Sequence, residues 1–274
     1  MVQQLAPDNL GSGQQGHNRM LDVHPPHHPA NSWRDFFVHI ATIVIGLLIA
    51  VGLEQTVEAV HHRKQVREFE AQMHEVLGND RLFTANDIES FRAGRAWLVD
   101  LQLAIITRRQ GKAAPQPALD DPRAAFPLTL PNLAPYEAAK QNGVVALLDT
   151  HRLRLFNRID LQHDLLRKDA LAFLDSLLPL TALRMRNDLE PDKFLSSRPL
   201  RAADLGKLSS IELAEYQALV ANTLAHGDQV VGRLKLFDAL AAGILEGVTD
   251  EAELVSKARA KVTAEDTGGT HTSP

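Results

Sequence analysis

Two short acid–histidine pairs are the residues of this chain best placed to do metal chemistry. Glu58 precedes His61 by three positions, and Asp160 precedes His163 by the same spacing. On a helix this spacing puts the carboxylate and the imidazole on one face, as a shared metal ion requires. Two such pairs, with two further inward-facing carboxylates, make the di-metal site of some four-helix bundles.

Composition weighs against a metal enzyme. The 34 acidic residues and 12 histidines among 274 residues would give about 1.5 such pairs by chance, and two are present. One pair uses Asp160 in place of glutamate, and His61 closely follows an apolar segment. The chain has no cysteine, and none of the glycine-rich phosphate loops, serine-nucleophile motifs or zinc-protease motifs. We therefore expect no enzymatic activity, no metal and no cofactor.

The element that must position everything else is an uncharged apolar stretch, Phe36–Leu53. As a helix it would measure about 27 Å, close to the hydrocarbon thickness of a bilayer. We predict a transmembrane helix over residues 33–54, with the lipid bilayer as a partner. A cleaved signal peptide, with the small residues Ala50 and Gly52 near its cleavage site, is the alternative. Its apolar core would begin late and run long for such a peptide.

Small residues share one face of the predicted transmembrane helix. Thr42, Gly46 and Ala50 are spaced by four positions. Such a face lets two helices approach closely, which is the usual basis of association in membranes. The spacing therefore favours a homo-oligomer that forms through this face.

Three ionisable residues lie on or near the same segment. His39 lies one turn inside it, and Glu54 and Glu58 continue the spacing of four beyond it. Ionisable groups at membrane depth are costly and often functional. If two helices pair, the facing carboxylates would raise the pKa of at least one of them. We treat these three residues as an ionisable element that pairing could make sensitive to pH.

The remainder of the chain predicts an all-α fold. Its composition is rich in alanine and leucine and only 5% aromatic, which favours helices. The expected divisions are a disordered tail (1–32), the transmembrane helix (33–54), a stalk with the first bundle helix (55–110), a Pro-rich loop (111–135), a helical bundle (136–248), and a short helix with a disordered tail (249–274). The expected architecture is a membrane helix that continues into a stalk, followed by an antiparallel helical bundle.

One long seam and one cap are the clearest local signals in the bundle. The seam alternates spacings of four and three through Tyr216, Val220, Thr223, Gly227, Val230, Leu234, Phe237, Ala241 and Ile244. A repeat of 3.5 residues is typical of helices packed side by side. Ser209 with Glu212 predicts a capping box at the start of this helix.

Other signals predict where helices end. Arg108 and Arg109 followed by Gly111 indicate a helix end, and residues 78–80 offer a break in the stalk. A short helix is expected over 136–141. Pro179 should kink or end the helix that begins near Asp149. The polar residues from Glu265 onward are expected to be disordered.

Two stretches resemble a family of uncharacterised bacterial single-pass membrane proteins, known only as a domain of unknown function. The first is WRDFFVHIATIVIGLLIAVGLEQ, residues 33–55, and the second is APYEAAKQNGVVALLD, residues 134–149. Tyr136 stands where that family more often has tryptophan. The resemblance implies an anchor in the bacterial inner membrane and an all-helical soluble region, and it supplies no catalytic residues.

The function expected from these features is that of a membrane-anchored scaffold, sensor or interaction protein with an unknown protein partner. A net charge of −5 without a basic patch argues against nucleic-acid binding. A ligand-sensing bundle, with a pocket under the Pro-rich loop, is the alternative. Flanking cations at Arg63, Lys64 and Arg67 favour a cytoplasmic soluble region, whereas the resemblance slightly favours a periplasmic one.

Overall fold

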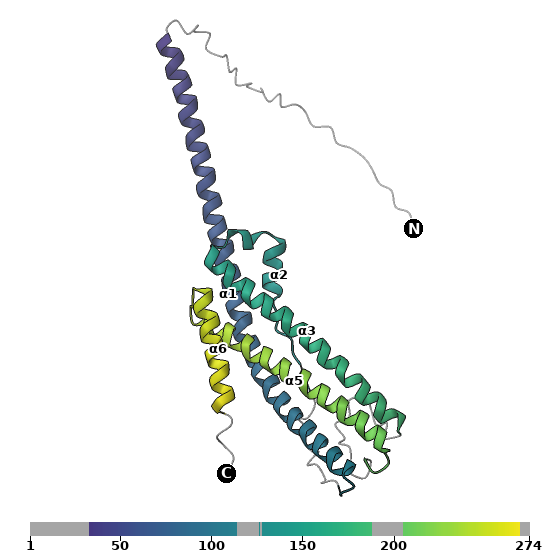
Figure 1. Ribbon diagram of the computed structural model, residues 1–274. Helices are drawn as coiled ribbons and strands as arrows, with labels where there is room; N and C mark the ends of the chain where they lie inside the picture. Colours follow the sequence, from purple (N-terminus) through teal and green to yellow (C-terminus); the bar gives the residue numbers. More distant parts are fainter. Residues whose placement is uncertain (1–32, 114–125, 127, 188–204, 269–274) are drawn as a thin grey trace, which may run out of the picture. The chain divides into compact units, whose positions relative to one another are not determined.

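The computed structural model describes residues 33–113, 126, 128–187 and 205–268, and all of its regular elements are helices. They are α1 (Trp33–Arg109), α2 (Ala134–Gln141), the 3₁₀ helix η1 (Val144–Leu147), α3 (Thr150–Arg186), α5 (Ser210–Leu245) and α6 (Glu251–Gly268) (Figure 1). The all-α class is confirmed. The predicted disordered tail over residues 1–32 lies outside the described residues.

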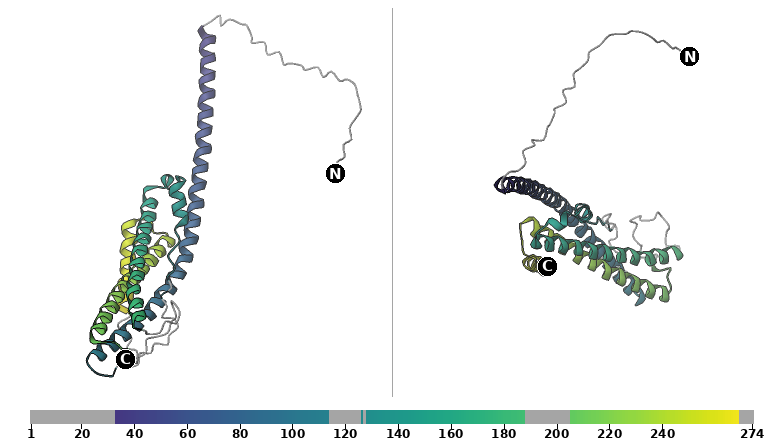
Figure 2. Two further views of the ribbon diagram at one scale, coloured as in Figure 1. Left: turned by 90° about the vertical axis from the view of Figure 1, so that its right-hand side faces the viewer. Right: turned by 90° about the horizontal axis from the view of Figure 1, so that it is seen from above.

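The chain divides into two units, residues 1–57 and residues 58–274. The described part of the first unit is the beginning of α1, residues 33–57, in which every side chain is exposed. The second unit contains the rest of α1 and all later helices. The predicted seam of α5 forms part of its core, because all nine seam residues are buried. α3 and α5 run side by side along most of their lengths (Figures 1 and 2).

The stalk break expected at residues 78–80 is absent, because α1 continues to Arg109. Leu77 is fully buried and Asp80 nearly so. Packing on both sides of Gly78 therefore offsets the modest cost of one glycine in a helix. The predicted end is confirmed: Gly111 has a φ of +74° just beyond Arg109, a left-handed conformation that ends helices.

Pro179 does not end α3, so the predicted helix end at this residue is wrong. The helix runs through it to Arg186. A proline in a helix removes one backbone hydrogen bond and crowds the preceding turn. Leu180 and Leu183, which follow it, are buried. Since a broken helix would expose these two side chains, their burial offsets the local cost.

The connection between α2 and α3 is tighter than expected. α2 begins at Ala134 instead of residue 136, because Pro135 fits the first turn of a helix, where its missing N–H is not needed. Gly143 then reverses the chain with a φ of +82°. The helix η1 follows, and the Asp149 side chain accepts a hydrogen bond from the Arg152 N–H at the start of α3.

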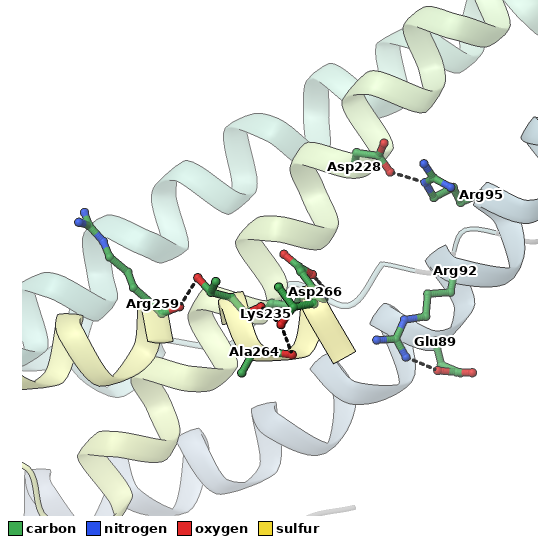
Figure 3. A network of polar contacts seen from close by, with 10 residues as sticks. Glu89, Arg92, Arg95, Asp228, Lys235, Arg259, Ala264 and Asp266 are labelled. Carbon is green, nitrogen blue, oxygen red and sulfur yellow. Dashed lines mark hydrogen bonds and ion pairs between the residues drawn. The ribbon is translucent and has the colours of Figure 1, made fainter. Parts of the chain in front are cut away.

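The C-terminal helix is longer than expected, whereas the cap of α5 is as predicted. Ser209 and Glu212 form the complete capping box. Residues 265–268, which were expected to be disordered, belong to α6. Asp266 of this helix forms an ion pair with Lys235 of α5, as Figure 3 shows. Arg95 of α1 likewise pairs with Asp228 of α5 at 2.7 Å, so α1 and α6 are each tied to α5 by an ion pair.

Candidate functional site

The described part of the first unit is long and apolar. Among the described residues, α1 is the one helix long and apolar enough to cross a bilayer. None of its side chains over Phe36–Leu53 is buried by protein. A soluble core helix would bury such a surface. The finding is compatible with a single-pass membrane protein.

The small-residue face of this segment is open. The Thr42 hydroxyl donates to the carbonyl of Val38 at 2.8 Å, which satisfies it within the helix. A Cβ atom added at Gly46 would meet no atom within 4 Å, and Ala50 is exposed. The face is therefore accessible to another helix over its full length.

The ionisable residues near this segment are also exposed. His39 and Glu54 lie on the surface of the first unit. Glu58, at the start of the second unit, lies 3.7 Å from the imidazole of His62. Glu58 therefore has a partner in the next turn of its own helix.

The two acid–histidine pairs are not brought together as a metal site. Asp160 accepts a hydrogen bond from Lys140 at 3.1 Å, and His163 lies 3.8 Å from Asp164. His61 is exposed on α1. Within the part of the chain that the structure describes, no three His, Asp or Glu side chains are grouped to hold a metal ion.

A buried pair of carboxylates, which the sequence analysis missed, fixes the end of the Pro-rich loop. Asp87 accepts a hydrogen bond from the Thr129 N–H at 2.7 Å, and Asp80 accepts one from the Asn132 N–H at 2.9 Å. Both side chains are almost inaccessible to solvent. We call residues 128–133 the strap, since these two bonds hold it along α1.

The environment of the strap shifts the ionisation of both carboxylates. Burial raises the pKa of Asp80 to about 6, although its hydrogen bond from Asn132 acts in the opposite direction. Burial likewise raises the pKa of Asp87. Thr84 lies between them on the same face, and its buried hydroxyl has no hydrogen-bond partner among the described residues. A signal was present: all three residues fall in the 3.5-residue repeat of α1, where apolar residues are expected.

An aromatic ring from the Pro-rich loop fills the space where a ligand pocket was predicted. The Phe126 ring packs against Phe91 at 5.4 Å and Phe173 at 4.9 Å between centroids. A Cβ atom at Gly94 would overlap this ring. The void left beside it has a volume of about 10 Å³. Only glycine at position 94 lets the ring lie this close to α1.

The stretch 134–149, which carries part of the family resemblance, forms a buried polar and aromatic cluster. The Tyr136 hydroxyl donates to the Asn157 side chain at 2.6 Å. Lys140 lies 4.9 Å from the centre of the same ring and reaches Asp160. Burial raises the pKa of Tyr136. These contacts attach α2 to α3. They give Tyr136 and Lys140 a structural role in packing the two helices together.

A surface groove of the second unit lies where α1 meets the start of α3. Its volume is about 620 Å³. From α1 come His62, Arg63, Val66 and Arg67, and from the later segment Leu147, Asp149 and Arg152. We call it the arginine groove. From the sequence, Arg63 and Arg67 indicate only membrane orientation, because Arg152, the third arginine of the groove, is distant in the sequence.

Comparisons with known proteins returned no match: neither a family model, nor a curated protein, nor a solved structure is similar to this chain.

Proposed function

We propose that this chain is a single-pass membrane protein whose helical region acts as a scaffold, sensor or interaction module. The observation that carries the proposal is the exposed, uncharged segment Phe36–Leu53. Leaving so many large apolar side chains in water would be costly, at about 25 cal/mol for each Å². A bilayer is the solvent in which this surface is stable.

We further propose that the chain works as a homo-oligomer that pairs through Thr42, Gly46 and Ala50. The openness of Gly46 supports this, since a partner backbone could approach it without displacing any side chain. The resemblance of residues 33–55 and 134–149 motivates placement in a bacterial inner membrane. The flanking cations favour a cytoplasmic bundle, and the resemblance slightly favours a periplasmic one.

Membrane attachment is tested by fractionation of cells that express the full chain. We expect the protein to pellet with membranes and to stay there after washes with alkaline carbonate and with urea, and to be released by detergent. Recovery in the aqueous fraction would refute the proposal. Two C-terminal reporter fusions, one active only in the cytoplasm and one active only in the periplasm, then assign the compartment of the bundle.

A second candidate function is ligand sensing beneath the Pro-rich loop. The observation in its favour is the Phe126 ring, which occupies an apolar space between α1, α3 and α5 and is held there by packing. Displacement of this ring would open a site of aromatic size. The test is whether a small aromatic probe such as indole binds wild type and binds the Phe126→Ala protein more tightly, because no ring has to be displaced there. Absence of binding to wild type would contradict this function.

A further inference from the structure

We propose that the arginine groove binds a phosphate group. The first step is the charge of its two α1 arginines. Among the described residues neither Arg63 nor Arg67 has a carboxylate partner, and both are exposed. Lys64, between them in the sequence, is paired with Glu68 at 3.7 Å. The positive charge of the two arginines is therefore left for a ligand.

The second step is the direction of the Arg67 side chain. Its Nε donates to the carbonyl of Arg63 at 3.3 Å, which folds the side chain back by one turn. Residues four apart share a helix face, so the two guanidinium groups lie on the same side of α1. Both Nη atoms of Arg67 stay available, because the bond to Arg63 uses only Nε. Planar guanidinium groups with several donors are well suited to phosphate oxygens.

The third step concerns the acidic groups that face the groove. Asp149 pairs with the Arg152 guanidinium at 3.3 Å and accepts a hydrogen bond from its N–H. Glu70 also forms an ion pair with Arg152. Arg152 balances only one of these two carboxylate charges, and Glu58 lies beside His62. The three arginines and two carboxylates therefore leave the groove a net charge of +1, and the two arginines without a carboxylate partner among the described residues, Arg63 and Arg67, are the groups that face an entering anion.

The fourth step is the shape of the ligand. Val66 and Leu147 are half-buried and contribute apolar surface to the groove. The groove, of about 620 Å³, is an open depression on the surface, so it can hold a charged group while the rest of the ligand stays outside it. The groove therefore suits a phosphate ester with an apolar portion beside the charge. Either a lipid headgroup or a soluble phosphate ester has this chemistry.

The chain makes a lipid source accessible. Arg63 follows Leu53 by only ten positions in the sequence, so the groove residues begin shortly after the apolar segment. The lipid source depends on the proposed membrane attachment, whereas binding of a soluble phosphate ester does not.

The test compares two double variants of the full-length chain, purified in neutral detergent. Arg63→Gln with Arg67→Gln removes both unpaired groove cations. Lys64→Gln with Arg92→Gln is the matched control, because it removes the same charge from exposed positions of α1 outside the groove. All four residues are exposed, and unchanged circular dichroism with an unchanged Tm establishes that the variants fold.

Two measurements distinguish the sources of the phosphate. In the soluble arm, glycerol 3-phosphate and inorganic phosphate are titrated while ³¹P NMR follows binding. In the lipid arm, native mass spectrometry compares retention of phosphatidylglycerol with that of phosphatidylcholine. We expect the groove variant to lose about tenfold or more in affinity in at least one arm, and the control to stay within about twofold.

Each outcome decides the proposal. A loss confined to the lipid arm identifies a headgroup, and a loss in the soluble arm identifies a soluble phosphate ester. Equal binding by wild type and the groove variant overturns the site. The site is also overturned if wild type binds the phosphate ligand in neither the soluble arm nor the lipid arm. An equal loss in the control variant also overturns it, since binding would then follow total charge. Membrane fractionation is scored separately, so failure of attachment is not confused with failure of the groove.

Discussion

The two parts of α1 differ in how their apolar side chains are buried, and this difference does not follow from how apolar each part is. Over residues 33–57 the helix is strongly apolar, yet no side chain is buried. Over residues 58–109 it carries many charges, yet it buries a continuous stripe from Phe69 to Ile105. Apolar surface without a protein partner requires a different solvent, which we propose is lipid. Charged residues with a buried stripe are typical of a helix packed in water.

The same comparison explains why polar residues occur on the buried stripe. The strap has no helix or strand partner for its N–H groups in the described structure, and buried N–H groups need acceptors. Asp80 and Asp87 supply them. The apolar part of α1 has no such need, because helical bonds satisfy its own backbone. The polarity of each part therefore follows from what surrounds it.

The largest predicted effect is on the apolar part. Ile45→Asp with Leu48→Asp places two charges at the centre of the proposed span. The cost of insertion should rise by about 5 to 7 kcal/mol, enough to abolish stable integration. Carbonate extraction of membranes would measure this as a shift from the pellet to the supernatant.

The control for this prediction lies on the other part of α1. Leu82 and Phe83 are also large, apolar and exposed. Leu82→Asp with Phe83→Asp should leave the protein in the pellet, because water already surrounds these positions. Equal behaviour of the two double variants would remove the distinction between the two parts of the helix.

The next effect concerns Asp80 and the pH dependence of stability. Its pKa is raised to about 6 in the folded state, from 3.8. The stabilisation from this group is complete below pH 4 and is lost as the pH rises through 6. Asp80→Asn keeps an acceptor for the Asn132 N–H and cannot ionise. The variant should therefore be more stable than wild type at pH 7.5, by up to about 3 kcal/mol. At pH 4, where Asp80 of wild type is protonated, this difference in stability should be smaller.

Chemical denaturation of the full chain at several pH values measures this difference. The informative quantity is the free energy of unfolding of the variant minus that of wild type at each pH. Asp100, exposed on the same helix, gives a matched control in Asp100→Asn, whose difference should stay flat. A flat difference for Asp80→Asn as well would contradict the proposed cost of its charge.

How far the sequence predicts this molecule depends on whether the partners are local. The α5 seam and its cap are local patterns, and they were predicted in full. Asp80 was not recognised, because its partner Asn132 is distant in the chain and a carboxylate in a seam ordinarily indicates an exposed position. The helix end predicted at Pro179 was wrong because the cost of a proline is local, whereas the compensating burial of Leu183 is tertiary. The groove needs Arg152 beside α1, which no spacing rule supplies.

The third prediction tests the contact between α1 and the Pro-rich loop. Gly94→Ala would force the Phe126 ring away from α1 and should lower the free energy of unfolding by about 1 to 3 kcal/mol. In a Phe126→Ala background the added methyl group meets no ring, so the penalty should disappear. Gly232→Ala in α5, where a Cβ atom meets nothing, should instead stabilise by about 0.5 to 1 kcal/mol. A penalty that persists without the ring would show that another contact sets it.

The smallest predicted effect returns to the apolar part of α1. Gly46→Leu adds a bulky side chain to the small-residue face, and it should reduce the crosslinked dimer in detergent by about tenfold if pairing uses this face. Gly52→Leu is the matched control, because Gly52 is equally open and points elsewhere around the helix. Both substitutions leave the fold of the single chain unstrained, so a change in crosslinking reports association alone. If Gly46→Leu crosslinks as wild type does, the apolar part of α1 contacts only lipid, and any oligomer must form through the bundle.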